Sequence, residues 1–249
     1  MDDWLTALVT EHSLPADAAD ELAERGFVVL PGPLPMEAIP HLQAAYDSAF
    51  ASAAAADVSL GRASTRVTDF VNRGAAFDAI YTWPPALDAC CRIIGRPFRL
   101  SAMHARTLRA GAFAQELHAD VPRTSDAWPM VGLILMIDAF HEGNGATRFV
   151  PGSHRWTEKS EVAVPDVCAS HPGEVLACGS AGSVILFDAS TWHGHAANAS
   201  GAPRRSLQMT YIPREGKPAT DFSARMQPET FARLDAVARY LTCVGSASS

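Results

Sequence analysis

The sequence lacks any segment long and apolar enough to cross a membrane. Apolar runs such as Val131–Ile137 fall far short of the roughly 20 residues that a membrane-spanning helix requires. The first residues, Met1-Asp2-Asp3-Trp4, also lack the basic start and the apolar stretch of a secretory signal. We therefore expect a protein with no membrane partner and no export signal.

Cysteine is scarce, and its arrangement excludes a disulfide framework and a cysteine zinc site. The count is odd and no C-x-x-C pair is present, the five residues being Cys90, Cys91, Cys168, Cys178 and Cys243. These residues are interpreted as reduced thiols, which predicts a cytoplasmic protein.

Positive charge is limited and almost free of lysine. The net charge is −7, which argues against a surface for nucleic acid or anionic membranes. Lys159 and Lys217 are the only lysines, so nearly all cations are arginines, the side chain suited to gripping carboxylates through two hydrogen bonds. A bias toward arginine and alanine can also arise from the base composition of the genome. Amino-acid composition alone favours this explanation over a role in binding carboxylates.

What is present predicts a single α+β domain over residues 1–249. Hydrophobic residues make up 48% of the chain, enough for a large core. Residues 1–97 are expected to form a mainly helical flank with one strand, residues 98–215 a jelly-roll catalytic core, and residues 216–249 a C-terminal helix and tail. Within the flank, the periodicity predicts helices at Asp17–Glu24, Met36–Ala56 and Ala86–Ile94 and a strand at Phe27–Leu30.

After Pro97 the pattern changes to short strands separated by Gly, Pro, Asn and Asp. Such spacing is typical of a β-sandwich or barrel, and helices followed by strands indicate an α+β fold. Val131–Ile137 is apolar throughout apart from Gly132, as expected for a strand covered on both faces. The expected strands are Phe98–Leu108, Met130–Phe140, Thr147–Val150, Val184–Phe187 and Ser206–Ile212.

Two histidines and an aspartate stand out as candidate metal ligands. His118 and Asp120 are one residue apart, so an extended chain presents both on one face. His193 follows the run Val184–Phe187 in the tripeptide Trp192-His193-Gly194. Two histidines and one carboxylate form the facial triad of non-haem Fe(II) oxygenases, which leaves three positions open at the metal. A chelating 2-oxoacid can fill two of these positions and dioxygen the third.

An arginine and a serine on a later strand are candidates for holding that oxoacid. Arg204 shares its strand face with Ser206, and together they can bind a distal carboxylate. Arg205 lies on the opposite face with Leu207 and Tyr211, so we expect it to have a surface or packing role.

These motifs together resemble the phytanoyl-CoA dioxygenase family. The resemblance runs from about Leu22 to Tyr211, with the motifs in the family's order and spacing. It is carried by Glu24–Leu30, Leu117-His118-Ala119-Asp120, Asn144–His154, Trp192-His193-Gly194, Asn198-Ala199-Ser200 and Arg204-Arg205.

This resemblance implies a double-stranded β-helix core that uses Fe(II), 2-oxoglutarate and dioxygen. It further implies that His118, Asp120 and His193 are the iron ligands and that Arg204 anchors 2-oxoglutarate. Related halogenases lack the carboxylate ligand, so Asp120 favours another oxidation over halogenation.

Some neighbouring residues are secondary candidates whose roles the sequence leaves open. His195 has the strand parity of His193, and it can contact 2-oxoglutarate, line the pocket or replace His193 as ligand. The spacing to Gly194 and Asn198 favours His193. Further candidates to face the pocket are Thr107 and Gln115, together with His104, although each can be an ordinary strand residue. His154 is expected to stabilise its turn.

Two polar segments are candidates for shaping the substrate pocket. The resemblance implies that Arg62–Arg73 approaches the iron, so Arg66 or Arg73 can hold an anionic substrate group, although a solvated loop is the favoured interpretation. Glu158–Gly173 is longer than a hairpin needs and is a candidate lid. Trp128 and Phe149 are expected to pack rather than to contact substrate.

The predicted function is therefore an Fe(II)- and 2-oxoglutarate-dependent dioxygenase that hydroxylates a small metabolite or natural-product intermediate and releases succinate and CO2. The alternatives are a non-catalytic binding protein of the same fold, a zinc hydrolase, or an oxygenase that desaturates, cyclises or epimerises its substrate. The sequence indicates neither the substrate nor the oligomeric state.

Overall fold

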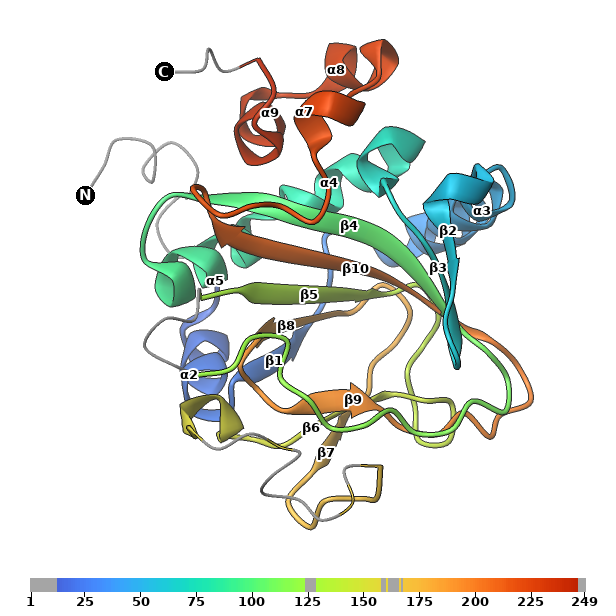
Figure 1. Ribbon diagram of the computed structural model, residues 1–249, viewed down its shortest axis with the longest axis vertical. Helices are drawn as coiled ribbons and strands as arrows, with labels where there is room; N and C mark the ends of the chain where they lie inside the picture. The colour runs from blue at the N-terminus through green and yellow to red at the C-terminus, as the bar shows by residue number, and fades with distance from the viewer. Residues whose placement is uncertain (1–12, 124–128, 158–159, 161–165, 167, 246–249) are drawn as a thin grey trace.

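The computed structural model describes residues 13–123, 129–157, 160, 166 and 168–245. These residues form two antiparallel β-sheets that face each other (Figure 1). The larger sheet has the strand order β1-β8-β5-β10-β4-β3-β2, and the smaller has the order β7-β6-β9. The strands are β1 (Phe27–Leu30), β2 (Val58–Leu60), β3 (Ser64–Val67), β4 (Phe98–Leu108), β5 (Val131–Met136), β6 (Thr147–Phe149), β7 (Val175–Ala177), β8 (Val184–Asp188), β9 (His193–His195) and β10 (Arg204–Pro213).

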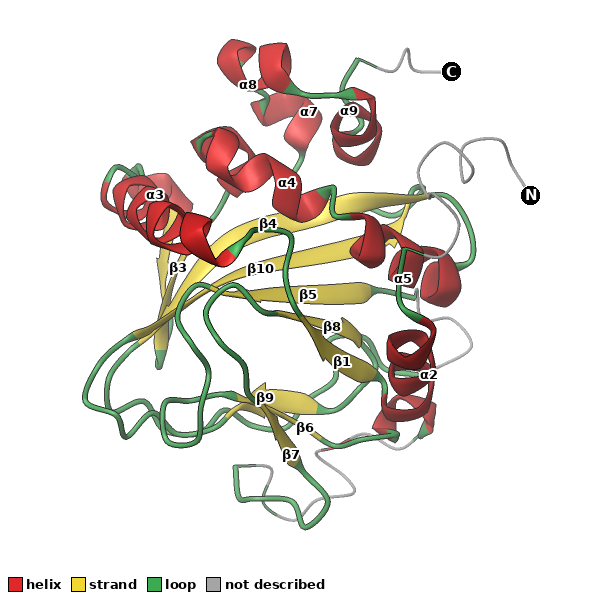
Figure 2. Cartoon of the chain, turned by 180° about the vertical axis from the view of Figure 1, so that it is seen from behind, coloured by secondary structure: helices red, strands yellow, loops and turns green. Residues whose placement is uncertain are grey.

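Helices cover the outer face of the larger sheet, opposite the smaller sheet (Figure 2). Within the described residues, no helix has the length and apolar character needed to cross a membrane. The α-helices are α2 (Ala16–Arg25), α3 (Ile39–Ala51), α4 (Asp78–Tyr81), α5 (Pro84–Ile94), α7 (Phe222–Arg225), α8 (Pro228–Arg233) and α9 (Ala236–Thr242). Short 3-10 helices are η1 (Met36–Ala38), η2 (Ala55–Asp57), η3 (Phe70–Arg73), η4 (Ala75–Phe77) and η5 (Ser153–Arg155).

The central strand β5 divides the apolar core into two layers. Every residue of β5 is buried, and successive side chains of a strand point to opposite faces. Leu133 and Leu135 belong to the core beneath the helices. Ile134 and Met136 belong to the core between the two sheets. This arrangement confirms the expectation of a strand covered on both faces, and the fold is the predicted α+β jelly roll.

The turn from α2 into β1 requires a glycine. Gly26 ends α2 in the left-handed region with φ +82°. A Cβ on this residue would lie 2.4 Å from the Thr191 hydroxyl, so a side chain here is excluded both by strain and by space. The ring of His154 packs at the same point and donates through Nε2 to the Ala23 carbonyl at 3.2 Å. This contact is consistent with the structural role expected for His154.

Two strands of the flank and two of the core, β7 and β9, were not predicted. The flank of residues 1–97 contains three strands instead of one, because β2 and β3 form a hairpin on the edge of the larger sheet. Both strands are short and partly polar, so this part of the sequence resembled a loop. Strand β7 is also short and lies just after the segment Glu158–Gly173. Half of that segment, including Glu158, lies outside the described residues, as does Trp128.

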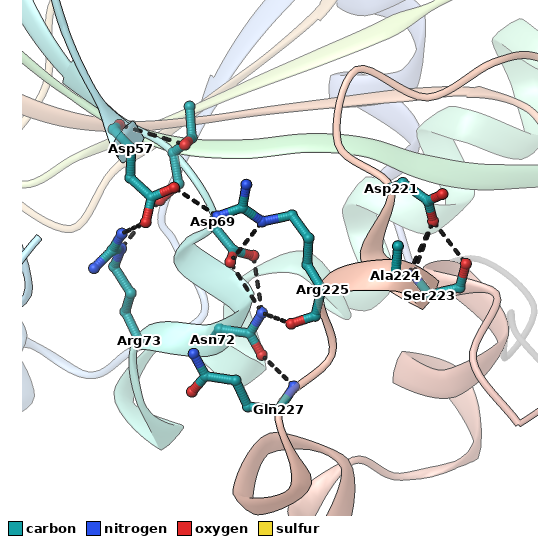
Figure 3. A network of polar contacts seen from close by, with 10 residues as sticks. Asp57, Asp69, Asn72, Arg73, Asp221, Ser223, Ala224, Arg225 and Gln227 are labelled. Atoms are coloured by element: carbon teal, nitrogen blue, oxygen red, sulfur yellow. Dashed lines mark hydrogen bonds and ion pairs between the residues drawn. The ribbon is translucent and has the colours of Figure 1, made fainter. Parts of the chain in front are cut away.

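The C-terminal region forms three short helices, and an ion-pair network ties the first of them to the β2–β3 hairpin (Figure 3). Arg225 in α7 donates to Asp57 at 2.5 Å and to Asp69 at 3.1 Å. Asp57 precedes the hairpin and also binds Arg73 at 2.9 Å, and Asp69 follows the hairpin. Asn72 donates to Asp69 and to the backbone carbonyl of Arg225. Both ends of the hairpin are therefore held by one arginine from the C-terminal region.

Candidate metal centre and adjoining cavities

The backbone holds two histidines side by side at one end of the small sheet. His193 begins β9, and His118 lies in the extended segment beside it. The two residues exchange both backbone hydrogen bonds, with N···O distances of 3.0 and 2.8 Å. Such an antiparallel pair places its side chains on the same face, and the ring centroids are 4.5 Å apart.

Hydrogen bonds to the backbone then orient both imidazoles. Nδ1 of His118 donates to the Glu116 carbonyl at 2.9 Å, and Nδ1 of His193 donates to the Thr191 carbonyl at 3.0 Å. In a neutral ring the proton on Nδ1 leaves a lone pair on Nε2. Those Nε2 atoms lie 3.6 and 3.7 Å from the two carboxylate oxygens of Asp120. This is the arrangement of a metal site in which carbonyl groups fix the ligating histidines.

The charges at this group suit a divalent cation. Ligand atoms from His118, Asp120 and His193 all lie within 4.8 Å of one another. Burial lowers the pKa of His193 and keeps its ring neutral. Burial opposes ionisation of both Asp120 and His118, but their mutual hydrogen bond and charges outweigh it, lowering the pKa of Asp120 and raising that of His118. A bound metal would replace the proton that His118 holds toward Asp120. A neutral imidazole and an ionised carboxylate are the protonation states in which these side chains bind a metal.

Two adjoining cavities share lining residues at this group. The smaller has a volume of about 330 Å³ and the larger about 1260 Å³. Both are lined by His118, His195, Gln115, Arg66 and Arg106. Asp120, His193 and Arg204 line the smaller one, which therefore contains the candidate ligands and the candidate cosubstrate anchor.

Arg204 is buried at the smaller cavity, and no described residue pairs with its charge. The residue is 2% exposed, and its Nε and Nη1 atoms have no hydrogen-bond partner in the described parts of the chain. The guanidinium lies 3.9 Å from the ring centroid of Phe140, a favourable contact that leaves the edge of the guanidinium free. Burial lowers its pKa to about 9, so the group remains charged at neutral pH. A buried, unpaired guanidinium fits the carboxylate of a bound organic acid.

The neighbouring arginine is arranged as predicted from strand parity. Arg205 points away from the cavities and pairs with Asp138 at 2.6 Å and Asp47 at 2.7 Å. Ser206 is completely buried, and its hydroxyl donates to the Arg106 carbonyl at 3.2 Å. A role for Ser206 in binding the cosubstrate therefore stays a prediction.

Of the secondary candidates, Thr107 lines neither cavity. Thr107 is three residues from His104 on one uninterrupted strand, so the two side chains point to opposite faces. His104 lines the smaller cavity, whereas the Thr107 hydroxyl is hydrogen-bonded to Tyr46 of α3 at 3.0 Å. The expectation that Thr107 contacts the cosubstrate is therefore wrong.

Gln115 and His195 do lie at the cavities. Nε2 of Gln115 is 3.5 Å from Nε2 of His118, and its Oε1 accepts from Arg106 at 3.0 Å. His195 donates through Nδ1 to the Ala196 carbonyl and does not belong to the metal-binding group. The geometry thus favours His193 over His195 as the ligand.

Arg106 and Thr147 are among the cavity residues that sequence reasoning missed, and it gave Arg66 less weight than the structure does. Arg106 shares the strand face of His104, a parity signal that was available in the sequence. Thr147 begins β6 and lines the smaller cavity, which no local pattern indicated. Arg66 lines both cavities, whereas Arg73 pairs with Asp57 outside them.

Comparisons with known proteins agree with this geometry. The family model of phytanoyl-CoA dioxygenase matches residues 22–206. Dioxygenase cdmA of Talaromyces verruculosus is 34% identical over 126 residues, which are 46% of this chain and 39% of that protein. Dioxygenase af480 of Aspergillus fumigatus is 27% identical over 228 residues, which are 86% of this chain and 72% of that protein.

Solved structures share the fold at low sequence identity. HygX from Streptomyces hygroscopicus, crystallised with nickel, 2-oxoglutarate and hygromycin B, has a TM-score of 0.67 at 15% identity and covers 82% of this chain and 90% of its own. The 2-oxoglutarate-dependent carbocyclase SnoK from nogalamycin biosynthesis has a TM-score of 0.65 at 18% identity and covers 87% of this chain and 92% of its own. Because the family model spans most of the chain, the protein belongs to the phytanoyl-CoA dioxygenase family of Fe(II)- and 2-oxoglutarate-dependent oxygenases.

Proposed function

We propose that this protein hydroxylates a small organic molecule, using Fe(II), 2-oxoglutarate and dioxygen and releasing succinate and CO2. The observation that carries the proposal is the metal-binding group, in which the Nε2 atoms of His118 and His193 face the carboxylate of Asp120. These three side chains are the proposed Fe(II) ligands. Such a centre, when occupied, couples the oxidation of 2-oxoglutarate by dioxygen to the oxidation of the substrate.

The chain's own residues bind and orient the two organic molecules. Arg204 is proposed to pair with the distal carboxylate of 2-oxoglutarate, which directs the oxoacid end toward the metal-binding group in the smaller cavity. Gln115 lies between Arg106 and His118, where its amide can donate to a bound oxoacid. The larger cavity adjoins the same histidine and has the volume to admit a small-molecule substrate.

The members of the site differ in their access to water. His193 is 8% exposed and Arg204 is 2% exposed, whereas the side chains of His118 and Asp120 are 34% and 31% exposed, so a bound substrate would have to cover that side. Excluding water strengthens the electrostatic contacts and limits side reactions of oxidised intermediates.

The oxidative outcome distinguishes this proposal from its alternatives. The similar structures include a carbocyclase and an epimerase as well as HygX, so ring closure or epimerisation is a second candidate outcome. A non-catalytic binding protein is disfavoured because the complete metal-binding group and the unpaired Arg204 are both retained.

The test has two stages. Anaerobic addition of Fe(II) and 2-oxoglutarate should produce a visible metal-to-ligand charge-transfer band, which His118→Ala, Asp120→Ala and His193→Ala should each abolish. A library of small organic molecules is then screened for succinate formation, and mass spectrometry of the product identifies hydroxylation by the gain of one oxygen atom. Absence of the band in the folded wild-type protein would contradict the proposal.

A further inference from the structure

The larger cavity is lined by four arginines, which we call the arginine cluster: Arg62, Arg66, Arg106 and Arg109. None of the four forms an ion pair with an acidic residue in the described parts of the chain. Arg62, Arg66 and Arg109 are exposed and Arg106 is half-buried. The cluster therefore places four cations without an acidic partner around the cavity that a ligand can enter.

Uncharged contacts hold two members of the cluster, Arg106 and Arg109, without neutralising them. Arg106 donates through Nε to the Ser64 hydroxyl at 3.2 Å and through Nη2 to the Gln115 amide oxygen at 3.0 Å. Arg109 donates to the backbone carbonyl of Arg62 at 3.2 Å. All of these acceptors are uncharged, so the full positive charge of each guanidinium remains directed at the cavity and its mouth.

The proposed cofactors leave this charge uncompensated. Among the residues that the structure describes, the acidic ones lining the two cavities are Asp120 and Glu116. A doubly charged 2-oxoglutarate balances an Fe(II) ion, and Asp120 balances Arg204. One carboxylate, that of exposed Glu116, then remains for four guanidinium groups. Charge balance therefore calls for a further anion in the larger cavity.

The mouth of the same cavity has an apolar element. Leu60 in the β2–β3 hairpin is 77% exposed, and Phe113 in the loop after β4 is 89% exposed. Both line the larger cavity, and exposed large apolar side chains beside a cavity indicate a surface that an apolar ligand covers.

We propose that the larger cavity binds the substrate as an organic anion, with a carboxylate, sulfate or phosphate group at the arginine cluster and an apolar skeleton against Leu60 and Phe113. The assignment of this ligand as the substrate rests on the proposed function. The charged group fixes the orientation of the molecule, and the apolar skeleton extends along the cavity that His118 also lines.

The test uses two fluorescent probes that differ in one anionic group. Anilinonaphthalene sulfonate has an apolar ring system and a sulfonate, and phenylnaphthylamine has the rings alone. Each is titrated into the full chain without metal and then with Mn(II) and 2-oxoglutarate. The sulfonate should bind at one saturable site, more tightly than the neutral amine, and added salt should reduce the difference.

Variants of the mouth residues separate the charged and the apolar contributions. The double variant Arg62→Gln/Arg109→Gln should weaken sulfonate binding about tenfold, or about 1.4 kcal/mol, with no change for the amine. Leu60→Ser/Phe113→Ser should weaken both probes. Arg155→Gln, which removes one exposed charge that lines neither cavity, is the control and should change neither. Near-ultraviolet circular dichroism shows that each variant is folded.

The outcomes are decisive in both directions. Equal binding of the two probes, or an equal effect of Arg155→Gln, would overturn the inference. Displacement of the sulfonate by 2-oxoglutarate without metal would assign the cluster to the cosubstrate and would also overturn it. The charge-transfer band is recorded in parallel, so failure of the proposed function appears as loss of that band, whereas failure of this inference appears only in the probe titrations.

Discussion

Replacing Arg204 by methionine should separate cosubstrate binding from stability. The guanidinium is 2% exposed, and two of its nitrogens have no partner, so the ligand-free protein carries the cost of a desolvated charge. Methionine preserves most of the volume and can retain contact with Phe140. The variant should therefore unfold at the same temperature as the ligand-free wild type or at a higher one.

The same substitution should greatly weaken the binding of 2-oxoglutarate, although it does not lower the stability of the ligand-free protein. Removing one partner of a buried ion pair costs about 3–5 kcal/mol, because the remaining charge is left unpaired. Since about 1.4 kcal/mol corresponds to a tenfold change in affinity, the dissociation constant of 2-oxoglutarate should rise by about a hundredfold or more. Metal binding should persist, because Arg204 is not part of the metal-binding group.

Thermal unfolding with Mn(II), recorded with and without 2-oxoglutarate, measures both effects. A ligand at about a hundred times its dissociation constant stabilises the native state by about 2.7 kcal/mol, which for a chain of this size corresponds to a shift of roughly 5–10 °C. The wild type should show this shift and Arg204→Met should lose it.

Arg205→Met is the matched control. This variant loses the ion pairs to Asp138 and Asp47, so it should unfold at a lower temperature yet keep the shift caused by 2-oxoglutarate. A full shift in Arg204→Met, or loss of the shift in Arg205→Met, would refute the assignment of Arg204 as the anchor.

Three further predictions follow from the contacts described above. His195→Ala should retain the charge-transfer band that His193→Ala abolishes, and the reverse result in anaerobic absorption spectra would show that the ligand assignment is wrong. Arg225→Ala removes two partly exposed ion pairs at the hairpin ends and should lower the free energy of unfolding in urea by about 1 kcal/mol; an unchanged value would show that the network adds no stability. Burial, with the charge of Arg66, lowers the pKa of His104 to about 4 from 6.5. Its imidazole is therefore neutral in the folded protein, and stability should fall by up to about 3 kcal/mol as the pH decreases from about 6.5 toward 4, since the unfolded chain takes up the proton first. In denaturant titrations, the stability of His104→Gln should depend less on pH than that of the wild type. If both proteins lose stability equally as the pH falls, His104 is not the cause of the pH dependence.

The sequence by itself determined the fold class, most strands and the candidate ligands. Alternation of polar and apolar residues is a local property, so β4 and the opposite orientations of Arg204 and Arg205 were readable from strand parity. Long apolar runs likewise predicted β5, because a strand buried on both faces has no polar side to display. His118 and Asp120 could be placed on one face from the sequence alone, because residues i and i+2 of an extended chain point the same way.

Tertiary structure alone decided what depends on distant segments. The approach of His193 to Asp120 requires β9 to pair with the His118 segment, and no local pattern encodes that partner. The β2–β3 hairpin is stable because it extends a sheet edge and is held by Arg225, more than 150 residues later in the chain, although its own residues resemble a loop. Thr107 was misplaced because the facing element, α3, sets which side of β4 is covered by helix. The unpaired charge of the arginine cluster was equally hidden, since a sequence lists the arginines but only the fold shows which of them lack acidic neighbours.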